Sequence, residues 1–514
     1  MSKTIIIIGA GLAGLSAALQ AAENGCNVKL VSSLPSERAQ SVMAEGGINA
    51  ALNTKDENDS PEEHFTDTIK AACGLADPNA VWGMTQAAPE LVHWLLKLGV
   101  KFNMSGYDDV DLRNFGGQKK KRTAFAQSDT GKQIMTAMID AVRRKEASGM
   151  VERFSHHSFL TLRLCGNICC GCVIRDEYSQ ETVELPGDAV IVATGGMHGL
   201  FGNTTGSLSN TGEVTAELFR LGVPLANGEM IQYHPTTVKC GGKRMLISEA
   251  ARGEGGRLFA MKDRKQWYFM EEKYPELGNL MPRDITAREI WKVSHESEVF
   301  LDMTEISEEI ISNKLSGLAD DCMTYLHKDI RKEPVSVLPG IHYFMGGILV
   351  DEQHRTPIQN LCAAGECCAQ YHGANRLGGN SLLGALYGGR VAAKSACEQA
   401  DVVDLSCATQ IDFPPTSQIS EIKQLNKVMQ ETMGVVRNEN TLLNGIQTVQ
   451  ALTGNLPLLG MAVLKSALAR KESRGAHWRE DYPKSNDDDY LKTTVARFDG
   501  KQIQISFVPV PERR

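Results

Sequence analysis

Short apolar runs alternate with longer helix-compatible stretches along the first part of the chain. Residues 5–8 are four isoleucines, a run typical of a strand buried on both faces of a parallel sheet. The glycine-rich GAGLAG follows, then a helix-compatible stretch at residues 15–23 and a second apolar strand in NVKLVSS. This order of strand, turn, helix and strand predicts a βαβ unit at the start of an α/β fold.

The three glycines of GAGLAG stand where a dinucleotide-binding turn requires them. Gly9 permits the tight turn, Gly11 lets the backbone approach a pyrophosphate, and Gly14 lets helix and strand pack closely. A turn that binds no ligand leaves this spacing unexplained. The acidic residue that usually binds a ribose about 20 residues later is absent, because Ser32 and Ser33 stand there. We therefore predict a dinucleotide site with Ser32 among its residues.

Later segments predict that this nucleotide-binding fold is interrupted and then resumed. DAVIVATGG is a further buried-strand pattern that ends in glycines, as expected near a dinucleotide. Residues from about 236 to 335 are more charged and helical, and short apolar strands return in VLPGIHYFMGGILVD and IQNLCAAGECC. A chain of 514 residues is also too long for one ordinary core.

These patterns predict an α/β fold in which a Rossmann-like domain is interrupted by an α+β capping domain and followed by a helical C-terminal region. The expected bounds are 1–235 and 336–411 for the discontinuous nucleotide-binding domain, 236–335 for the capping domain, 412–470 for the helical domain, and 471–514 for a polar C-terminal tail.

Composition narrows the class of protein and its partners. The net charge of −8 argues against nucleic acid or an anionic membrane, which both select basic surfaces. Residues 4–22 are uncharged, but their glycine pattern favours the βαβ reading over a membrane span. Thirteen scattered cysteines without a signal sequence predict reduced thiols and a cytoplasmic location.

Several polar residues lie in glycine-rich or helix-start settings in the second half of the chain. Each alone has an ordinary structural explanation, such as a buried histidine or a surface ion pair. Together they supply hydrogen-bond donors without a matching nucleophile or metal set, which suits a small polyanion such as a dicarboxylate beside a cofactor. They are His234, Ser248, Glu249, Arg252, Arg283, His342 and Arg376.

The chain resembles the flavoprotein subunit family of succinate dehydrogenase and fumarate reductase, which includes L-aspartate oxidase. The matching motifs occur in order from residue 5 to about residue 483, which makes the resemblance specific. It implies FAD bound by the Rossmann-like domain and a capping domain that closes over a dicarboxylate. The motifs are GAGLAG, RAQSVMAEGGINAAL, RNFGG, ATGG, QYHPTT, EAARGEGG, PRD, HYFMGG, AAGE, HGANRLGGNSL and ESRGAHWREDYP.

The resemblance also implies roles for the polar residues. Arg376 and His342 are expected to hold one carboxylate of fumarate, and His234 with Ser248 the other, although Ser248 replaces the more usual threonine. Arg283 is expected to deliver a proton to one alkene carbon while flavin N5 delivers hydride to the other. Free arginine is a poor acid, so its proton must be restored through a relay. Glu249 and Arg252 match that relay.

On the cofactor side, the resemblance places Glu366 as the acid that binds a ribose of FAD. The other expected contacts are Ser41, Glu45, Gly46, Gly47, Glu213, Ser381 and Leu382; at Glu213 the family's following glycine is Val214. Complex-bound members carry a histidine, covalently joined to the flavin, at the position of Gln40. A glutamine amide is not nucleophilic, so we expect non-covalent FAD, a lower flavin potential and fumarate reduction as the favoured direction.

Two further runs have simpler explanations than ligand binding. CGNICCGC does not have the paired CxxC spacing of a zinc site, and we expect a β-hairpin that turns at Gly166–Asn167, with no metal. KKKR, residues 119–122, is expected to be a solvated loop, although it could lie near a substrate entrance or attract an acidic electron-donor protein.

The sequence leaves more than one function open. Fumarate reduction is the leading expectation, and L-aspartate oxidation on the same scaffold is the nearest alternative. Phe115 stands where L-aspartate oxidases tend to have a glutamate, which disfavours binding of an ammonium group. A third candidate is a subunit that depends on an iron–sulfur or other electron-donor partner, because the chain carries no cysteine motif for clusters. A flavin protein without catalysis is disfavoured by the complete substrate set.

Overall fold

A five-stranded parallel sheet forms the centre of the nucleotide-binding part of the chain. The computed structural model describes residues 2–106, 109–399, 407–413, 415 and 417–514. The strand order is β20-β10-β1-β2-β6, and every neighbouring pair is parallel. The bounds are β1 Thr4–Ile8, β2 Asn27–Ser32, β6 Val151–Ser155, β10 Ala189–Val192 and β20 Leu361–Ala363. This arrangement confirms the predicted Rossmann-like fold.

Both faces of this sheet are covered, which explains the uninterrupted isoleucine run. Ile5 and Ile7 belong to the core beneath the helices, whereas Ile6 and Ile8 pack into the core on the opposite face. The helical layer contains α1 (Leu12–Glu23), α3 (Pro78–Leu98), α4 (Thr130–Ala147) and α11 (Asn380–Gln399), with α2 (Pro61–Ala71) packed on α3. The other layer contains the antiparallel strands β7 (His157–Cys165), β8 (Ile168–Asp176) and β9 (Thr182–Pro186), together with α5 (Glu213–Arg220).

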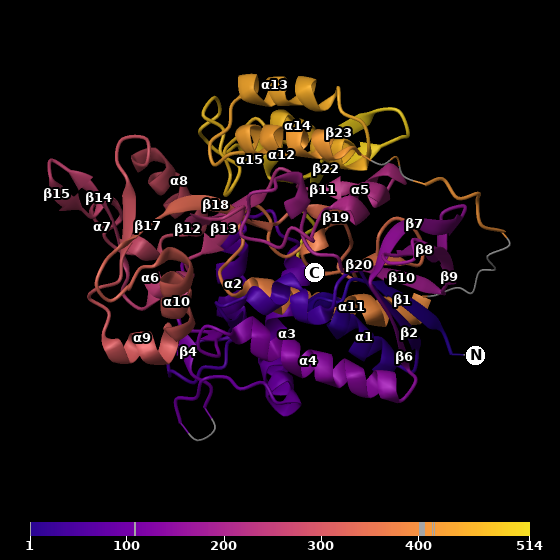
Figure 1. Ribbon diagram of the computed structural model, residues 1–514, viewed down its shortest axis with the longest axis horizontal. Coiled ribbons are helices and arrows are strands. Elements are labelled where there is room, and N and C mark those ends of the chain that lie inside the picture. The colour runs from indigo at the N-terminus through magenta and orange to yellow at the C-terminus, as the bar shows by residue number, and fades with distance from the viewer. Residues whose placement is uncertain (1, 107–108, 400–406, 414, 416) are drawn as a thin grey trace.

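An antiparallel sheet with the order β13-β12-β18 connects this core to the inserted segment. Its strands are β12 (Ile231–Cys240), β13 (Lys243–Leu246) and β18 (Leu338–Phe344), so the expected domain boundary at 235/236 falls inside β12. The insertion itself comprises the sheet β15-β14-β16-β17 and helices α6 to α10, which share one apolar core. It lies at the left of the view, away from the parallel sheet (Figure 1). Its bounds are β14 Arg257–Lys262, β15 Lys265–Trp267, β16 Val299–Asp302, β17 Val335–Ser336, α6 Glu249–Gly253, α7 Phe269–Lys273, α8 Arg283–Val293, α9 Glu308–Lys314 and α10 Ser316–Asp321.

The C-terminal region contains three packed helices, as expected, and also two strands that the sequence patterns did not indicate. The helices α12 (Ile419–Thr432), α13 (Glu439–Val449) and α14 (Asn455–Ala469) lie along the top of Figure 1. Within the expected polar tail, α15 (Asp487–Tyr490) precedes a hairpin of β22 (Lys492–Phe498) and β23 (Ile503–Pro509). β22 pairs with β11 (Leu225–Ala226) in the sheet β21-β19-β11-β22-β23, with β19 Gly347–Leu349 and β21 Cys368–Ala369.

Several short elements position loops around the sheet edge. The strands β3 (Ile48–Asn49), β5 (Thr123–Ala124) and β4 (Leu112–Arg113) form a small antiparallel sheet. The remaining short helical turns are η1 Ser36–Arg38, η2 Gln40–Met43, η3 His198–Leu200, η4 Gly278–Leu280, η5 Cys322–Leu326 and η6 Gly365–Cys367.

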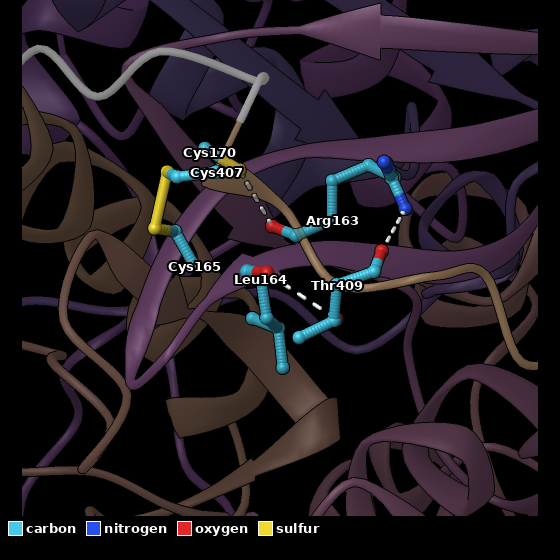
Figure 2. Close-up of a disulfide and its surroundings, with 6 residues drawn as sticks. All are labelled: Arg163, Leu164, Cys165, Cys170, Cys407 and Thr409. Atoms are coloured by element: carbon cyan, nitrogen blue, oxygen red, sulfur yellow. Dashed lines mark hydrogen bonds between the residues drawn. A yellow bond between two sulfur atoms is a disulfide. The ribbon is translucent and has the colours of Figure 1, made fainter.

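The cysteine-rich run forms the predicted hairpin, but not all cysteines are free thiols. β7 and β8 are joined at Gly166–Asn167, where Gly166 has a φ of +59°, as such a turn requires. Cys165, beside this turn, forms a disulfide with Cys407, 242 residues later, as Figure 2 shows. The Thr409 N–H donates to the Leu164 carbonyl of the same strand at 2.9 Å, and the Thr409 carbonyl accepts from the Arg163 side chain at 2.7 Å. The expectation of reduced thiols is therefore wrong for Cys165 and Cys407, which lie far apart in sequence but meet at the hairpin tip.

The last residue of the KKKR run is not solvated. Arg122 is fully buried and forms ion pairs with Asp59 at 2.8 Å and Asp67 at 2.9 Å. Its neighbour Lys121 keeps half of its side chain exposed. A solvated-loop interpretation is therefore wrong for Arg122, because acidic residues from a distant segment close over it.

We expect Arg122→Met to lower stability strongly, since it leaves Asp59 and Asp67 buried without their cation. Removing one partner of a buried ion pair costs about 3–5 kcal/mol. Lys121→Met is the matched control and should change stability by no more than about 0.5 kcal/mol. Thermal unfolding followed by circular dichroism measures both variants. Equal unfolding midpoints for the two variants would contradict the ion-pair interpretation.

Candidate functional site

A cavity of about 870 Å³ extends from the carboxyl ends of the parallel strands to the junction with the insertion. Every site residue predicted from the sequence lines this cavity, except Gly14 and Arg252. Gly14 lies inside the first turn of α1, and Arg252 lies behind Glu249 on α6. The structure therefore brings predicted site residues from Gly9 to Leu382 into one place.

The turn before α1 has the shape that a pyrophosphate-binding turn needs. Gly9 has a φ of +111°, and a Cβ there would lie 2.3 Å from the Ala193 carbonyl oxygen. A Cβ on Gly14 would lie 1.8 Å from the Gly9 carbonyl oxygen, whereas at Gly11 the nearest atom would be Ser41 Oγ at 3.6 Å. The N-cap residue Gly11 has no side chain with which to cap α1, and the hydroxyl of Ser41 lies at this helix N-terminus. The N-terminus of a helix favours an anion, so the residues fit a dinucleotide.

The other expected cofactor residues surround this turn. Ser32 ends β2, and its buried hydroxyl has no hydrogen-bond partner among the described residues. Gln40 and Ser41 lie on η2, and Ser41 Oγ accepts a hydrogen bond from the Leu12 backbone N–H at 3.3 Å. Glu213 begins α5, and Ser381 and Leu382 lie in the first turn of α11.

Two carboxyl groups in the cavity wall are poorly solvated. Burial raises the pKa of Glu45 to about 8, with a further contribution from the charge of Asp321. Burial also raises the pKa of Glu366 to about 7, although its Oε1 accepts a hydrogen bond from the Phe344 N–H at 3.0 Å. Hydroxyl groups of a bound ligand would therefore find hydrogen-bonding partners on both side chains.

Close packing fixes the loop that follows Glu45. A Cβ on Gly46 would lie 3.0 Å from the Phe115 ring, and a Cβ on Gly47 would lie 2.5 Å from the Ala124 carbonyl oxygen. Gly47 also has a φ of +134°, a conformation that favours glycine. A side chain at Gly46 or Gly47 would therefore collide with neighbouring atoms of the cavity wall.

Two histidines face each other across the antiparallel pair β12 and β18. The ring centroids of His234 and His342 are 5.2 Å apart. His342 Nδ1 is 2.8 Å from Thr205 Oγ1, whereas His234 Nε2 is buried without a partner. Burial and then the positive charge of Arg283 hold the pKa of both rings well below the usual range. Both histidines are therefore neutral at neutral pH, and each can donate one N–H hydrogen bond.

A series of charged side chains in contact with one another extends from the insertion to the cavity. Arg283, at the start of α8, donates from Nε at 2.9 Å and from an Nη at 2.5 Å to the same oxygen of Glu249. The other carboxylate oxygen of Glu249 accepts from the Gly116 N–H at 3.1 Å and lies 3.4 Å from a nitrogen of Arg252. Although burial acts in the opposite direction, Arg283 and Arg252 lower the pKa of Glu249. The carboxylate is therefore ionised.

Arg376 contributes a second cation from the other side of the cavity. It is 3% exposed, its Nε has no hydrogen-bond partner, and its guanidinium lies 4.4 Å from the centroid of the Tyr343 ring. Among the described residues it forms no ion pair. Burial, and then the charge of Arg283, lower its pKa to about 9. A bound anion would offset this unfavourable environment.

Gln232 connects Arg283 and Arg376 and was not among the site residues predicted from the sequence. The Gln232 side chain donates to the backbone carbonyl of Arg376 at 2.8 Å and accepts from Arg283 at 3.1 Å. Its position two residues before His234 was the available signal, since alternate residues of a strand share a face. Tyr343, whose ring lies beside the Arg376 guanidinium, was also not predicted as a site residue. Nothing in its local sequence pattern distinguishes it from a core residue.

Other features of the described chain set limits on the site. No cluster of three or more His, Cys, Asp or Glu residues suited to a metal ion occurs among the described residues. Ser248 caps α6 by accepting a hydrogen bond from the Ala250 N–H. Among those same residues, none of the helices is both long and apolar enough to span a membrane.

Comparisons with known proteins agree with this geometry. A family model described as "FAD binding domain" matches residues 4–382, and another described as "Fumarate reductase flavoprotein C-term" matches residues 452–513. The chain is 38% identical to a succinate dehydrogenase flavoprotein subunit of Bacillus subtilis, with 100% of this chain and 98% of that protein covered. It is 32% identical to an 8-methylmenaquinol:fumarate reductase flavoprotein subunit of Wolinella succinogenes, over 100% of this chain and 92% of that protein.

Solved structures show the same likeness. A mutant FrdA chain of E. coli quinol fumarate reductase superimposes with a TM-score of 0.90 at 27% identity, covering 99% of this chain and 97% of that one. Sdh1 of Mycobacterium smegmatis gives a TM-score of 0.83 at 29% identity, covering 100% and 95%. The chain therefore belongs to the family of succinate dehydrogenase and fumarate reductase flavoprotein subunits, and its cofactor is FAD.

Proposed function

We propose that the chain interconverts fumarate and succinate in this cavity, with fumarate reduction as the favoured direction. The observation that carries the proposal is the buried guanidinium of Arg376, which has no carboxylate partner among the described residues and lies near the cation of Arg283. A dicarboxylate would supply the negative charge that this environment lacks. The Bacillus subtilis relative is named for succinate oxidation and the Wolinella succinogenes relative for fumarate reduction, so these names agree with either direction of this reaction.

Four side chains are proposed to hold the substrate. Arg376 and His342 bind one carboxylate, and His234 with Ser248 binds the other. Support comes from His234 Nε2 and Arg376 Nε, which are buried polar atoms without protein partners in the cavity wall. Neutral histidines suit this role because they donate a hydrogen bond without adding a further buried charge.

Arg283 is proposed to move the proton. Bound FAD supplies the hydride of the reaction. Arg283 keeps its guanidinium in place through Glu249 and Gln232, so one of its N–H groups can be aimed at the substrate carbon. Loss of that proton leaves a neutral guanidine, and Glu249 with Arg252 behind it forms the path that restores the proton. Orientation of the substrate and electrostatic stabilisation of its transition state would both contribute to the rate in such a site.

Phe115 favours fumarate over L-aspartate. The ring is 1% exposed and packs under Gly46 and Gly378 in the cavity wall. A substrate ammonium beside this ring would be buried without a partner, which costs several kcal/mol.

Gln40 supports non-covalent FAD and the reductive direction. It lies on η2 in the cavity wall, at the position where the resemblance places the covalently linked histidine of complex-bound members. Without that link, which withdraws electron density from the flavin, the reduced cofactor is the stronger reductant. A lower potential favours giving electrons to fumarate over taking them from succinate.

An electron-donor partner is part of the proposal. The relatives are named as flavoprotein subunits, which indicates that they function within larger assemblies. An iron–sulfur protein is the proposed partner here, and a reduced carrier or free reduced flavin is the alternative. Co-purification from the native host, followed by iron analysis, distinguishes these sources.

Arg283→Ala should lower kcat for fumarate reduction by about 10²–10⁴-fold, the usual contribution of a positioned proton donor. The absorption spectrum of bound flavin should not change, because Arg283 acts on the substrate. Arg376→Ala should also raise KM, since it removes a group that binds the ground state. Reduced viologen serves as electron donor in the assay.

Arg288→Ala is the matched control on the same helix, because Arg288 lies over the Trp478 ring and outside the cavity wall. It should retain activity within about 2-fold. Near-normal turnover by Arg283→Ala would show that another group donates the proton.

The wild-type protein should reduce fumarate and release negligible hydrogen peroxide with L-aspartate, because the Phe115 environment cannot pair an ammonium group. A coupled peroxidase assay measures the second activity. Rapid aspartate oxidation would assign the chain to the other activity of this scaffold.

Acid precipitation should release the yellow flavin into the supernatant, since Gln40 cannot form a covalent bond to it. A fluorescent protein band on a denaturing gel would rule this out. Initial rates with suitable dyes should be higher for fumarate reduction than for succinate oxidation, and the opposite ratio would overturn the proposed direction while leaving the site assignment intact.

A further inference from the structure

The loops that leave β2 and β6 form one end of the cofactor cavity. These strands are parallel neighbours, with Ser32 opposite Ser155. The residues that follow each strand therefore emerge side by side, and residues 33–35 and 156–159 both line the cavity. In a Rossmann-like fold the pyrophosphate binds at the first turn and the adenosine half extends toward the end of β2. The segment after Ser155 thus lies beside the adenosine end.

Two aromatic side chains meet at this end. The rings of His156 and Tyr178 have centroids 5.1 Å apart with an interplanar angle of 54°, and both residues line the cavity. Tyr178 is nevertheless 78% exposed, so little protein covers it. An exposed tyrosine ring that faces a cofactor cavity offers an unused aromatic surface.

The backbone holds this pair firmly in position. His156 has a φ of +59°, a left-handed conformation that is uncommon for residues other than glycine. Its carbonyl accepts a hydrogen bond from the Glu177 N–H at 2.8 Å. Asp176 accepts from the Tyr178 N–H at 2.7 Å, which fixes the turn that carries the second ring. Strained residues that the surrounding contacts hold in place are concentrated at ligand sites.

The chain also lacks the usual polar contact at this end of the site. Ser32 and Ser33 replace the acid that commonly binds the ribose, and the buried Ser32 hydroxyl has no hydrogen-bond partner among the described residues. Contacts to the base can compensate, because nucleobases bind aromatic faces without needing a specific hydrogen-bond pattern.

We propose that His156 and Tyr178 form the adenine-binding wall of the FAD site. His156 precedes β7 and Tyr178 lies in the turn between β8 and β9, so this antiparallel sheet would contribute to cofactor binding as well as covering the parallel sheet. This inference depends on FAD binding and not on the dicarboxylate substrate, so it can fail while the proposed reaction holds.

The test measures the rate at which holoenzyme releases FAD after dilution, followed by the rise in free-flavin fluorescence. Tyr178→Ala should increase this rate by about 5-fold to 100-fold, in keeping with the strength of base–aromatic stacking. Tyr178→Phe keeps the ring and should release FAD within about 3-fold of the wild-type rate. An unchanged rate in Tyr178→Ala, or equal acceleration in Tyr178→Ala and Tyr178→Phe, would overturn the proposal.

Ser179→Ala is the matched control, because it removes one hydrogen bond of the same turn, from the Glu181 N–H to Ser179 Oγ at 3.2 Å, without altering either ring. It should release FAD at the wild-type rate. If it accelerates release as much as Tyr178→Ala does, the turn and not the ring holds the cofactor, and the proposal is wrong.

His156→Gly separates binding from folding. Glycine adopts the left-handed conformation without strain, so the thermal midpoint of the FAD-free protein should stay the same or rise while FAD release becomes faster. A slower or unchanged release rate would exclude a role for the His156 ring in binding the cofactor.

Discussion

The structure depends on a cluster of buried arginines at the junction between the parallel-sheet core and the insertion, where the positive charges outnumber the carboxylates that pair with them. Arg283, Arg252 and Arg376 are all buried there, and Glu249 is the carboxylate placed among them. Buried cations without partners are unfavourable, so the fold must hold them firmly until an anion arrives. The dicarboxylate proposed as substrate would complete an electrostatic arrangement that the protein alone leaves incomplete.

The insertion and the rest of the chain both contribute residues to this cluster of arginines. The insertion contributes Arg283, Glu249 and Arg252 on α6 and α8, whereas Arg376 comes from the loop before α11. Gln232, on the connecting strand β12, touches both sides through a single amide group. The Gly116 N–H, from the loop between β4 and β5, also binds Glu249. Small changes in the packing of the insertion would therefore alter the distance between Arg283 and Arg376.

Local sequence patterns predicted the elements that depend on neighbouring residues. The isoleucine run, the turn at Gly9 and the hairpin at Gly166–Asn167 follow from periodicity and backbone preference, and the structure has all three. The ordered motifs identified the family, and the residues taken from them lie around one cavity. Their individual roles stay predictions.

What the patterns could not predict depends on contacts between distant segments. Arg122 is buried because Asp59 and Asp67 pack over it, and no neighbour in the run KKKR signals this. The disulfide of Cys165 likewise needs a partner from 242 residues away. In the same way, β22 is polar enough to resemble a tail, and it becomes a strand because β11 offers it an edge.

That pairing has a consequence for how the protein is made. β11 immediately precedes the strand that carries Gln232 and His234, yet its partner β22 begins at Lys492, more than 260 residues later. During synthesis on the ribosome, which adds about 5–20 residues per second, this edge stays open for tens of seconds. An open edge of this kind can pair with other chains. Chaperone or cofactor binding would be most valuable late in that interval, after β20 has completed the parallel sheet and before β22 pairs with β11.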